Sequence, residues 1–358
     1  MRIAIDASRT TSARVTGTER YALQLTRALI DLDSTHHFWL YFRDTPPPDL
    51  FPSDERVVTR LLRQPRLWTH TAFAAALWRD RPDVTFVPAH SLPLIAPGRM
   101  AVTVHDLGFR YFPEAHPWWP RLYLHLSTAF SARRAGVILA DSRATAADLT
   151  RFYGTPPGKI RVVYPGVDAP RIDNLAAVRR KYGLPERYFL FLGTLQPRKN
   201  IARLVQAYAR WRARSPQNDA ALVLAGGKGW LYDEAWTSGV DGILLTGYVD
   251  EADKGALYAE ALALVFPSLH EGFGFPVLEA MHCGTPVICS NTSSLPELAG
   301  DAALLVDPLD TDAIADAMNR LASDAALRAE LAAKGRLQAA RFTWERAARE
   351  ALAALESA

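Results

Sequence analysis

Cysteine is scarce in this chain of 358 residues. The two that are present, Cys283 and Cys289, lie six positions apart in apolar surroundings, and neither belongs to a Cys-x-x-Cys pair. A disulfide framework or a zinc cluster would need more ligands at closer spacing. We therefore expect two buried thiols in a protein of a reducing compartment.

Long apolar runs are also missing. No segment approaches the roughly 18–20 consecutive apolar residues that a membrane-spanning helix needs. The N-terminus, MRIAIDASRT, has too short an apolar run for a signal peptide. The sequence therefore predicts a cytoplasmic protein, and it leaves open a peripheral contact with the inner face of the cell membrane through the N-terminal domain.

Three further absences narrow the function. No Gly-x-Gly-x-x-Gly follows either opening strand, which argues against a nicotinamide enzyme. No nucleic-acid module or dense basic run is present, so nucleic acid is not an expected partner. Asp31-Leu-Asp33 and Asp310-Thr-Asp312 match a metal-binding Asp-x-Asp only formally, because the first ends an expected helix and the second stands at an expected helix N-cap. We expect no metal and no cofactor.

Charge is unevenly distributed, although the net charge is only +3. Residues 1–165 hold 21 Lys and Arg against 14 Asp and Glu, whereas the remaining residues hold 20 against 24. A basic N-terminal half suits anionic partners such as phosphate-bearing acceptors or lipid head groups. An arginine-rich composition without a specific partner explains the same balance.

Short apolar strands alternate with longer helical stretches, which is the pattern of βα units around a parallel sheet. The length of the chain favours two domains. A first series of expected strands comprises Arg2–Asp6, Phe38–Phe42, Val57–Leu62, Val84–Pro88, Ala101–His105, Val137–Ala140 and Ile160–Tyr164. A second series comprises Tyr188–Leu192, Ala221–Ala225, Gly242–Gly247, Ala263–Pro267, Pro286–Cys289 and Ala303–Val306. The pattern predicts two Rossmann-like domains, residues 1–167 and 168–344, with Arg171–Tyr182 as a polar and basic connection.

The most informative segment runs from Ser268 to Gly284 and follows an expected strand. Gly272 and Gly274 would form a loop at the N-terminus of the next helix, where backbone amides favour a diphosphate or sugar hydroxyls. Glu271 at the lip of this loop and Glu279 inside the helix could accept hydrogen bonds from sugar hydroxyls. Acidic residues near helix N-termini also serve simply to stabilise the helix dipole, so these residues alone leave both interpretations open.

Glu271 and Glu279 enclose the seven residues GFGFPVL, which resemble the E-x7-E signature of retaining glycosyltransferases of family four. Gly284–Ile288, Ser294–Glu297 and Ala302–Pro308 resemble the same family. The resemblance implies an α/β protein of the GT-B fold, in which two Rossmann-like domains face each other across a cleft with their parallel sheets.

The resemblance also implies what each domain binds. Residues 1–167 would form the acceptor-side domain, to which the final helix, 345–358, crosses back, and 168–344 would bind the nucleotide sugar. Glu271 would act as a catalytic residue that holds the sugar, and Glu279 would accept hydrogen bonds from the ribose. Further donor contacts are implied for Gly272, Phe273, Gly274 and Phe275.

Arg198 and Lys199 end a second informative segment, Phe191–Asn200. Two adjacent cations at the carboxyl end of a strand can neutralise a diphosphate. The segment is similar to the phosphate-binding loop of the family, although many members carry Arg where Thr194 stands. Tyr248 and Val249 resemble the strip whose backbone reads the base of the donor.

His105-Asp106-Leu107 resembles a motif of the N-terminal domain of the family. His105 is expected to contact the sugar and to shape the acceptor side, with Asp106 as the group that orients its ring. Gly17 resembles a flexible loop that closes over the donor diphosphate, although Glu19 stands where the family often has a second glycine.

Phe109–Leu126 is rich in aromatic residues and includes Pro117-Trp-Trp-Pro120 together with Arg110 and Arg121. Such a segment could form an acceptor surface or an interfacial surface. A helix packed on the sheet is the other interpretation.

The predicted function is metal-independent transfer of a hexose, with retention, from a nucleotide diphosphate sugar to a hydroxyl of a glycan or a lipid-linked glycan. The segments HDL and GTLQPRKN together resemble bacterial mannosyltransferases of surface polysaccharide assembly, which implies GDP-mannose as donor. UDP-glucose and UDP-N-acetylglucosamine remain alternatives. Outside the transferases, a sugar-nucleotide 2-epimerase of the same fold or a non-catalytic partner subunit stays open.

Overall fold

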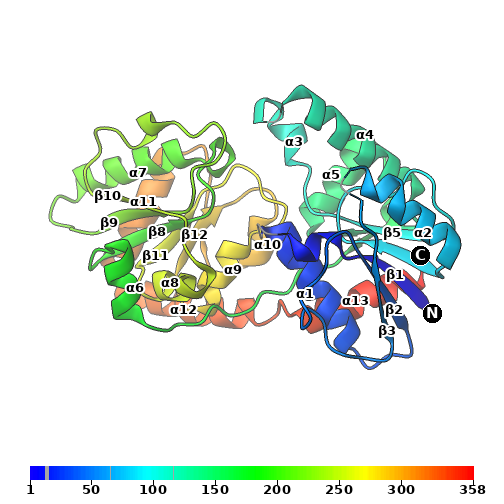
Figure 1. The fold of residues 1–358 in the computed structure, drawn as a ribbon. Coiled ribbons are helices and arrows are strands. Elements are labelled where there is room, and N and C mark those ends of the chain that lie inside the picture. Colours follow the sequence, from blue (N-terminus) through cyan, green and yellow to red (C-terminus); the bar gives the residue numbers. More distant parts are fainter. Residues whose placement is uncertain (13–15, 65, 116) are drawn as a thin grey trace. The chain divides into compact units, whose positions relative to one another are not determined.

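The computed structural model describes residues 1–12, 16–64, 66–115 and 117–358. The chain forms two compact units, each built on one parallel β-sheet (Figure 1). The first unit holds residues 1–166 together with 342–358, and the second holds residues 167–341. The chain thus enters the second unit one residue before the boundary drawn from the sequence and returns at Phe342.

The first unit contains a seven-stranded sheet in the order β3-β2-β1-β4-β5-β6-β7. Its strands are β1 (Arg2–Asp6), β2 (His37–Phe42), β3 (Val57–Leu61), β4 (Val84–Val87), β5 (Arg99–Val104), β6 (Val137–Ala140) and β7 (Ile160–Val162). Its helices are α1 (Gly17–Asp31), α2 (Ala72–Asp80), α3 (Gly108–Tyr111), α4 (Trp118–Arg134), α5 (Arg143–Tyr153) and α13 (Trp344–Glu356). Short 3-10 helices are η1 (Ser8–Thr11), η2 (Trp68–His70), η3 (Pro113–Ala115) and η4 (Pro157–Lys159).

The last helix of the chain, α13, belongs to the first unit because of its small apolar face. Ala347 and Ala351 are fully buried in the core that also contains Tyr21 of α1. At the start of α13, a Cβ atom on Gly166 would lie only 2.2 Å from the backbone nitrogen of Trp344. Glycine is therefore required where the outgoing and the returning segments touch.

The second unit contains a six-stranded sheet in the order β10-β9-β8-β11-β12-β13. Its strands are β8 (Tyr188–Leu192), β9 (Ala221–Ala225), β10 (Ile243–Gly247), β11 (Ala263–Phe266), β12 (Val287–Ser290) and β13 (Leu304–Val306). Its helices are α6 (Leu175–Tyr182), α7 (Ile201–Arg214), α8 (Lys254–Ala259), α9 (Phe275–His282), α10 (Leu295–Ala299), α11 (Thr311–Ser323) and α12 (Ala325–Ala339). Short 3-10 helices are η5 (Pro197–Lys199), η6 (Glu234–Trp236) and η7 (Glu251–Asp253).

The strand pattern predicted from the sequence is confirmed. Each of the thirteen expected strands is present, and no strand end differs from its expected position by more than two residues. Every residue of β6 and β8 is buried. Central strands of a parallel sheet are covered by helices on both faces, so they appear in the sequence as continuous apolar runs.

The expected connection Arg171–Tyr182 is wrong in part, because it contains helix α6. Val178 buries one face of this short helix. On the exposed side, Lys181 Nζ donates to Asp250 at 2.6 Å and to Asp253 at 2.5 Å, and Arg179 pairs with Glu260 at 3.1 Å. The basic residues that suggested a linker are therefore the solvent-facing side of an amphipathic helix.

Both sheets have a point at which the strand order reverses direction. It lies between β1 and β4 in the first sheet and between β8 and β11 in the second. At such a point the connections leave the carboxyl ends of two neighbouring strands in opposite directions, which opens a crevice where ligands bind. Functional residues are therefore expected after β1 and β4 and after β8 and β11.

The loop after β9 depends on a glycine that touches the loop after β8. Gly226 has φ +143°, and a Cβ atom on it would lie 2.0 Å from the carbonyl oxygen of Gly193. The next residue, Gly227, has open space around its Cβ position. We expect Gly226→Ala to lower the Tm by about 5–10 °C and Gly227→Ala to change it by less than about 2 °C. Thermal unfolding of both variants checks this, and equal effects would contradict the required close approach.

Candidate active site

Three charged residues of the second unit meet at the point where its strand order reverses. Strand β8 leads to η5, which carries Arg198 and Lys199, and the neighbouring strand β11 leads to Glu271. Lys199 Nζ donates to Glu271 Oε1 at 2.5 Å, and Arg198 Nη1 donates to Oε2 at 3.3 Å. The sequence pointed to each of these residues separately, and the tertiary structure joins them into one ion cluster.

Backbone contacts hold the loops of this cluster together. The amide of Leu269 donates to the carbonyl of Arg198 at 2.9 Å, and Arg198 Nη1 donates to the carbonyl of His270 at 2.8 Å. Asn200, in a left-handed conformation with φ 61°, donates from Nδ2 to the carbonyls of Pro267 and Pro308 at 3.1 and 2.7 Å. Asparagine tolerates this conformation better than most residues. Sequence reasoning missed Asn200, although it directly follows the Arg-Lys pair.

The electrostatics of the cluster favour an anionic ligand. Burial by itself would raise the pKa of Glu271, but the charges of Lys199 and Arg198 lower that pKa below its ordinary value. The carboxylate is therefore ionised at neutral pH. Lys199 Nζ also lies 4.7 Å from the ring centre of Phe266, so an aromatic face contributes to holding the ammonium group. Two cations against one carboxylate leave a net positive charge that a diphosphate can neutralise.

The glycine loop after Glu271 is fixed from one side by a serine. Ser294 Oγ donates to the carbonyl of Glu271 at 3.0 Å and to the carbonyl of Phe273. Gly274 is the N-cap of α9 with φ +133°, and a Cβ atom on it would lie 2.7 Å from Leu295 Cδ2. The N-terminus of α9, with its partial positive charge, is thereby held next to the ion cluster.

Glu279 lies in α9 and is only 2% exposed. The hydroxyl of Tyr258 donates to Glu279 Oε2 at 2.9 Å. Burial raises the pKa of Tyr258 and the nearby Glu279 charge raises it further, so the hydroxyl stays protonated as a donor. A ribose that binds Glu279 as expected would have to approach a carboxylate that is almost fully buried in this structure. Sequence reasoning missed Tyr258.

Tyr248 and Val249, expected to read the base, follow the edge strand β10. Strand β9 separates β10 from β8 and therefore from the ion cluster. The Tyr248 side chain is exposed and that of Val249 is buried.

In the first unit, His105 follows β5 and is held by two acceptors. Its Nδ1–H donates to Asp141 Oδ2 at 2.7 Å, and its Nε2–H donates to the carbonyl of Pro88 at 3.2 Å. We expected Asp106 to orient this ring, but the carboxylate that accepts the ring Nδ1–H is that of Asp141. Asp106 Oδ1 instead accepts the amide of Gly108 at 2.8 Å. Strands β5 and β6 are neighbours, so Asp141 at the end of β6 lies beside His105, while the chain after Asp106 turns into α3.

The surroundings of His105 favour its charged form. Burial lowers the pKa of His105, but the charge and the hydrogen bond of Asp141 outweigh burial and raise the pKa above 6.5. An imidazole with acceptors at both nitrogens donates from both, which requires the imidazolium. The backbone amide of His105 donates to His90 Nε2 at 3.3 Å, and burial together with the His105 charge lowers the pKa of His90 to about 4. His90 is therefore neutral.

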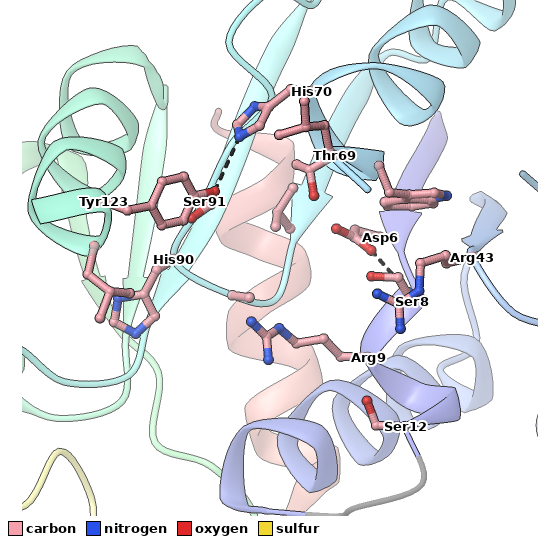
Figure 2. A pocket seen from close by; sticks show the side chains of 15 residues that line it. Asp6, Ser8, Arg9, Ser12, Arg43, Thr69, His70, His90, Ser91 and Tyr123 are labelled. Carbon is pink, nitrogen blue, oxygen red and sulfur yellow. Dashed lines mark hydrogen bonds between the residues drawn. The ribbon is translucent and has the colours of Figure 1, made fainter. Parts of the chain in front are cut away.

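A pocket of about 440 Å³ lies where the order of the first sheet reverses (Figure 2). Asp6 Oδ1 accepts the amide of Ser8 at 3.0 Å, and His70 pairs with the hydroxyl of Tyr123 at 3.2 Å; both bonds are drawn in Figure 2. Burial raises the pKa of Asp6. The polar side chains around this space are those of Asp6, Ser8, Arg9, Ser12, Arg43, Thr69, His70, His90, Ser91 and Tyr123. Sequence reasoning missed this pocket, although Ser8 and Arg9 directly follow the first strand.

Gly17 lies in the first turn of α1, so the expectation that it belongs to a flexible loop is wrong for this residue. Residues 13–15, before it, lie outside the described part of the chain. Thr16 and Glu19 form the capping box that starts the helix, and Arg9 Nη1 donates to Glu19 at 2.9 Å. The glutamate at the position of the family's second glycine therefore caps α1 and holds a pocket arginine.

Other expectations concern cysteines, metals and membrane spans. Cys283 and Cys289 are buried free thiols as predicted, and burial raises the pKa of each to about 12. Asp310 caps α11, as predicted, by accepting the amides of Asp312 and Ala313. Within the described ranges there is no cluster of three or more His, Cys, Asp or Glu side chains that could hold a metal ion. No helix formed by those residues has the length and apolar character needed to cross a bilayer.

Two Rossmann-like units and a cation-rich site at the sheet reversal of the second unit are the features of a GT-B glycosyltransferase. The chain belongs to the family-four glycosyltransferases. Residues 15–171 match the family described as Glycosyltransferase Family 4, and residues 176–338 match Glycosyl transferases group 1. The predicted fold of two Rossmann-like domains and the prediction of a glycosyltransferase are thereby confirmed.

Among its relatives, the O-antigen chain mannosyltransferase B of Escherichia coli is 34% identical over 363 positions, which cover 92% of this chain and 93% of that protein. The serotype-specific mannosyltransferase WbdA of Escherichia coli is 33% identical over 74% of this chain, but the match spans only 34% of WbdA.

Two solved structures share the fold over nearly the whole chain. Sucrose-phosphate synthase from Thermosynechococcus elongatus has a TM-score of 0.75 at 25% identity and covers 98% of this chain, with 97% of that chain covered. Anabaena HepE in complex with UDP and glucose also has a TM-score of 0.75, at 17% identity, with both chains fully covered.

The pair of His105 and Asp141 predicts a pH-dependent stability. Because the folded-state pKa of His105 lies above 6.5, its contribution is complete below pH 6.5 and is lost as pH rises through the folded-state pKa. In Asp141→Asn the buried ring loses the carboxylate, so the pKa of His105 falls. We expect the Tm difference between wild type and variant to be largest near pH 6 and to shrink toward pH 9.

Thermal unfolding across this pH range measures the difference, and subtraction of the two curves removes the titration of histidines that do not interact with His105. NMR titration of the His105 ring gives its pKa directly. A Tm difference that does not change with pH would contradict a charged His105.

Proposed function

We propose that the protein transfers mannose from GDP-mannose to a hydroxyl of a glycan or a lipid-linked glycan, with retention and without a metal ion or another cofactor. The observation that carries the proposal is the cluster of Arg198, Lys199 and Glu271 at the reversal of the second sheet. The choice of mannose is supported by the 34% identity to a mannosyltransferase over more than nine tenths of both chains. The UDP complex of HepE, at 17% identity, keeps a UDP-sugar as the alternative donor.

On the donor side, Arg198 and Lys199 would neutralise the diphosphate as it leaves. A donor with a neutralised leaving group needs no divalent cation for charge stabilisation. Glu271, fixed between the two cations, would accept hydrogen bonds from the hydroxyls of the sugar. Glu279 is assigned to the ribose, and the backbone after β10, at Tyr248 and Val249, to the base.

Further donor contacts are assigned to the loop that leads into α9. The backbone amides there and the positive end of the helix dipole suit the oxygens of the diphosphate. The loop residues assigned to the donor are Gly272, Phe273, Gly274 and Phe275. Gly17, in the first turn of α1, is assigned to the diphosphate from the first unit.

On the acceptor side, His105 would act as a positively charged hydrogen-bond donor rather than as a general base. Its pKa is raised, and both ring nitrogens face acceptors in this structure. A sugar hydroxyl could take the place of the Pro88 carbonyl at Nε2. The polar pocket next to His90 is of a size and chemistry suited to a sugar residue of the acceptor. We assign Asp106 to the same site because its charge raises the pKa of His105.

The test separates binding of the nucleotide from binding of the sugar. Calorimetric titration with GDP, GDP-mannose, UDP-glucose and UDP-N-acetylglucosamine identifies the donor. We expect Lys199→Ala to weaken the binding of GDP and of GDP-mannose alike, by about 10- to 100-fold, because it removes a charge from the diphosphate site. Glu271→Gln keeps the shape of the side chain, and we expect it to weaken the binding of GDP-mannose but not that of GDP. Lys228→Ala is the matched control, since Lys228 is an exposed lysine paired with Glu234 in the neighbouring loop.

Each alternative has its own outcome. Tight binding of a UDP-sugar in place of GDP-mannose would replace mannose in the proposal and keep the transferase. Release of nucleotide diphosphate and an epimerised sugar without any acceptor would identify a 2-epimerase. Loss of binding for all donors would indicate a non-catalytic subunit, and equal effects of Lys199→Ala and Lys228→Ala would contradict the cluster as the donor site.

Metal independence and retention are tested with the product. We expect transfer to continue at an unchanged rate in excess EDTA, because Arg198 and Lys199 supply the positive charge at the diphosphate. The new linkage should have the α configuration of the donor, which NMR of the anomeric proton determines. A rate that falls in EDTA and returns with Mg²⁺ or Mn²⁺, or a β-linked product, would refute these parts of the proposal.

A further inference from the structure

Helix α4 exposes large apolar side chains in its first half and buries small polar ones in its second half. In its first half, Trp118 is 69% exposed and Trp119 is 62% exposed. In its second half the buried residues include Ser127, Thr128 and Ser131. A helix on a protein surface normally buries its large apolar side chains and exposes its small polar ones, so the first half of α4 needs a partner other than water.

The exposed side chains of this half form one continuous surface. The rings of Trp118 and Trp119 lie edge to face with their centres 5.3 Å apart. Residues three and four positions apart lie next to each other on a helix, which extends the surface along the first two and a half turns. We call this surface the α4 surface; its members are Trp118, Trp119, Leu122, Tyr123 and Leu126, all of them exposed. The interpretation of the segment as a packed helix is therefore right for the second half of α4 and for Leu124 in its first half.

Arginines outnumber carboxylates in the segment of the sequence that contains the α4 surface. Between Leu107 and Arg134 the sequence contains four arginines and a single carboxylate, Glu114. Arg121 lies in the same half of α4, and its Nη1 donates to the carbonyl of Pro113 at 3.0 Å. Tryptophan and tyrosine prefer the interface between water and lipid, and arginine binds phosphate head groups. A surface of this composition fits an anionic bilayer.

The α4 surface also borders the polar pocket of the first unit. Tyr123 belongs to the surface and lines the pocket (Figure 2). Leu124, which follows it, lines the pocket as well. A sugar bound in the pocket would therefore lie beside the residues that contact lipid. This geometry suits an acceptor whose glycan is attached to a lipid in the same membrane.

We propose that the α4 surface docks the protein onto anionic lipid bilayers and thereby brings the pocket to a lipid-linked acceptor. The docking follows from the exposed side chains and their charge alone. The link to the acceptor rests on the proposed function.

The test uses the full chain and vesicles of phosphatidylcholine, with and without phosphatidylglycerol. We expect wild type to sediment with the anionic vesicles and the double variant Trp118→Ala/Trp119→Ala to bind them at least about tenfold more weakly, because two large apolar side chains are lost from the contact. Arg121→Gln should reduce the preference for phosphatidylglycerol. The matched control is Trp230→Ala, which removes a 43% exposed tryptophan from the second unit and should leave vesicle binding unchanged.

Three outcomes would overturn the docking: no binding of wild type to anionic vesicles, equal binding of wild type and the double variant, or conversion of a dimer to a monomer by the double variant without any vesicle binding. The last would identify the α4 surface as a contact between two copies of the chain. An unchanged Tm and unchanged GDP-mannose binding of the double variant show that it is folded. Vesicle binding without binding of any nucleotide sugar would refute the proposed function and leave the docking intact.

Discussion

The candidate active site of the second unit depends on one buried carboxylate, Glu271, which is held between Lys199 and Arg198. An ionised carboxylate is costly to bury unless cations and hydrogen bonds compensate for the lost water. Here both cations lie in η5, which follows β8, and β8 is the neighbour of the strand that leads to Glu271. The ion pairs therefore also join the two loops where the sheet order reverses. In the proposed function, the net positive charge of these three side chains serves a diphosphate. The three side chains that join the two loops are therefore the same ones to which we assign the anion.

The first unit repeats this arrangement with the charges exchanged. His105 is the central ionised group, and Asp141 from the neighbouring strand keeps it protonated despite burial. Burial, together with the charge of His105, lowers the pKa of His90 and keeps it neutral at the edge of the polar pocket. In both units, opposite charges that follow neighbouring strands keep a buried group ionised: Glu271 in the second unit and His105 in the first. Neither pair requires residues that are close in the sequence.

Much of the fold could be predicted because the relevant signals are local. Strands such as β6 and β8 are covered on both faces, and their continuous apolar residues therefore mark them directly. Cap residues such as Asp310 act within one turn and can be recognised in the same way. Helix α6 was missed because eight residues with one buried side chain give too weak a periodic signal against their basic composition. Likewise, a run of aromatic residues in α4 does not reveal which of them the sheet covers.

The sequence by itself determined the succession of βα units, the family resemblance and the identity of most residues at the second sheet's reversal, because these features depend on short stretches of chain. The tertiary structure decided which of those residues meet. It placed Lys199 against Glu271 across 72 positions, and it assigned His105 to Asp141 rather than to the adjacent Asp106. The physical reason is that neighbouring strands of a parallel sheet are brought together by strand order, and their carboxyl ends meet whatever the length of chain between them.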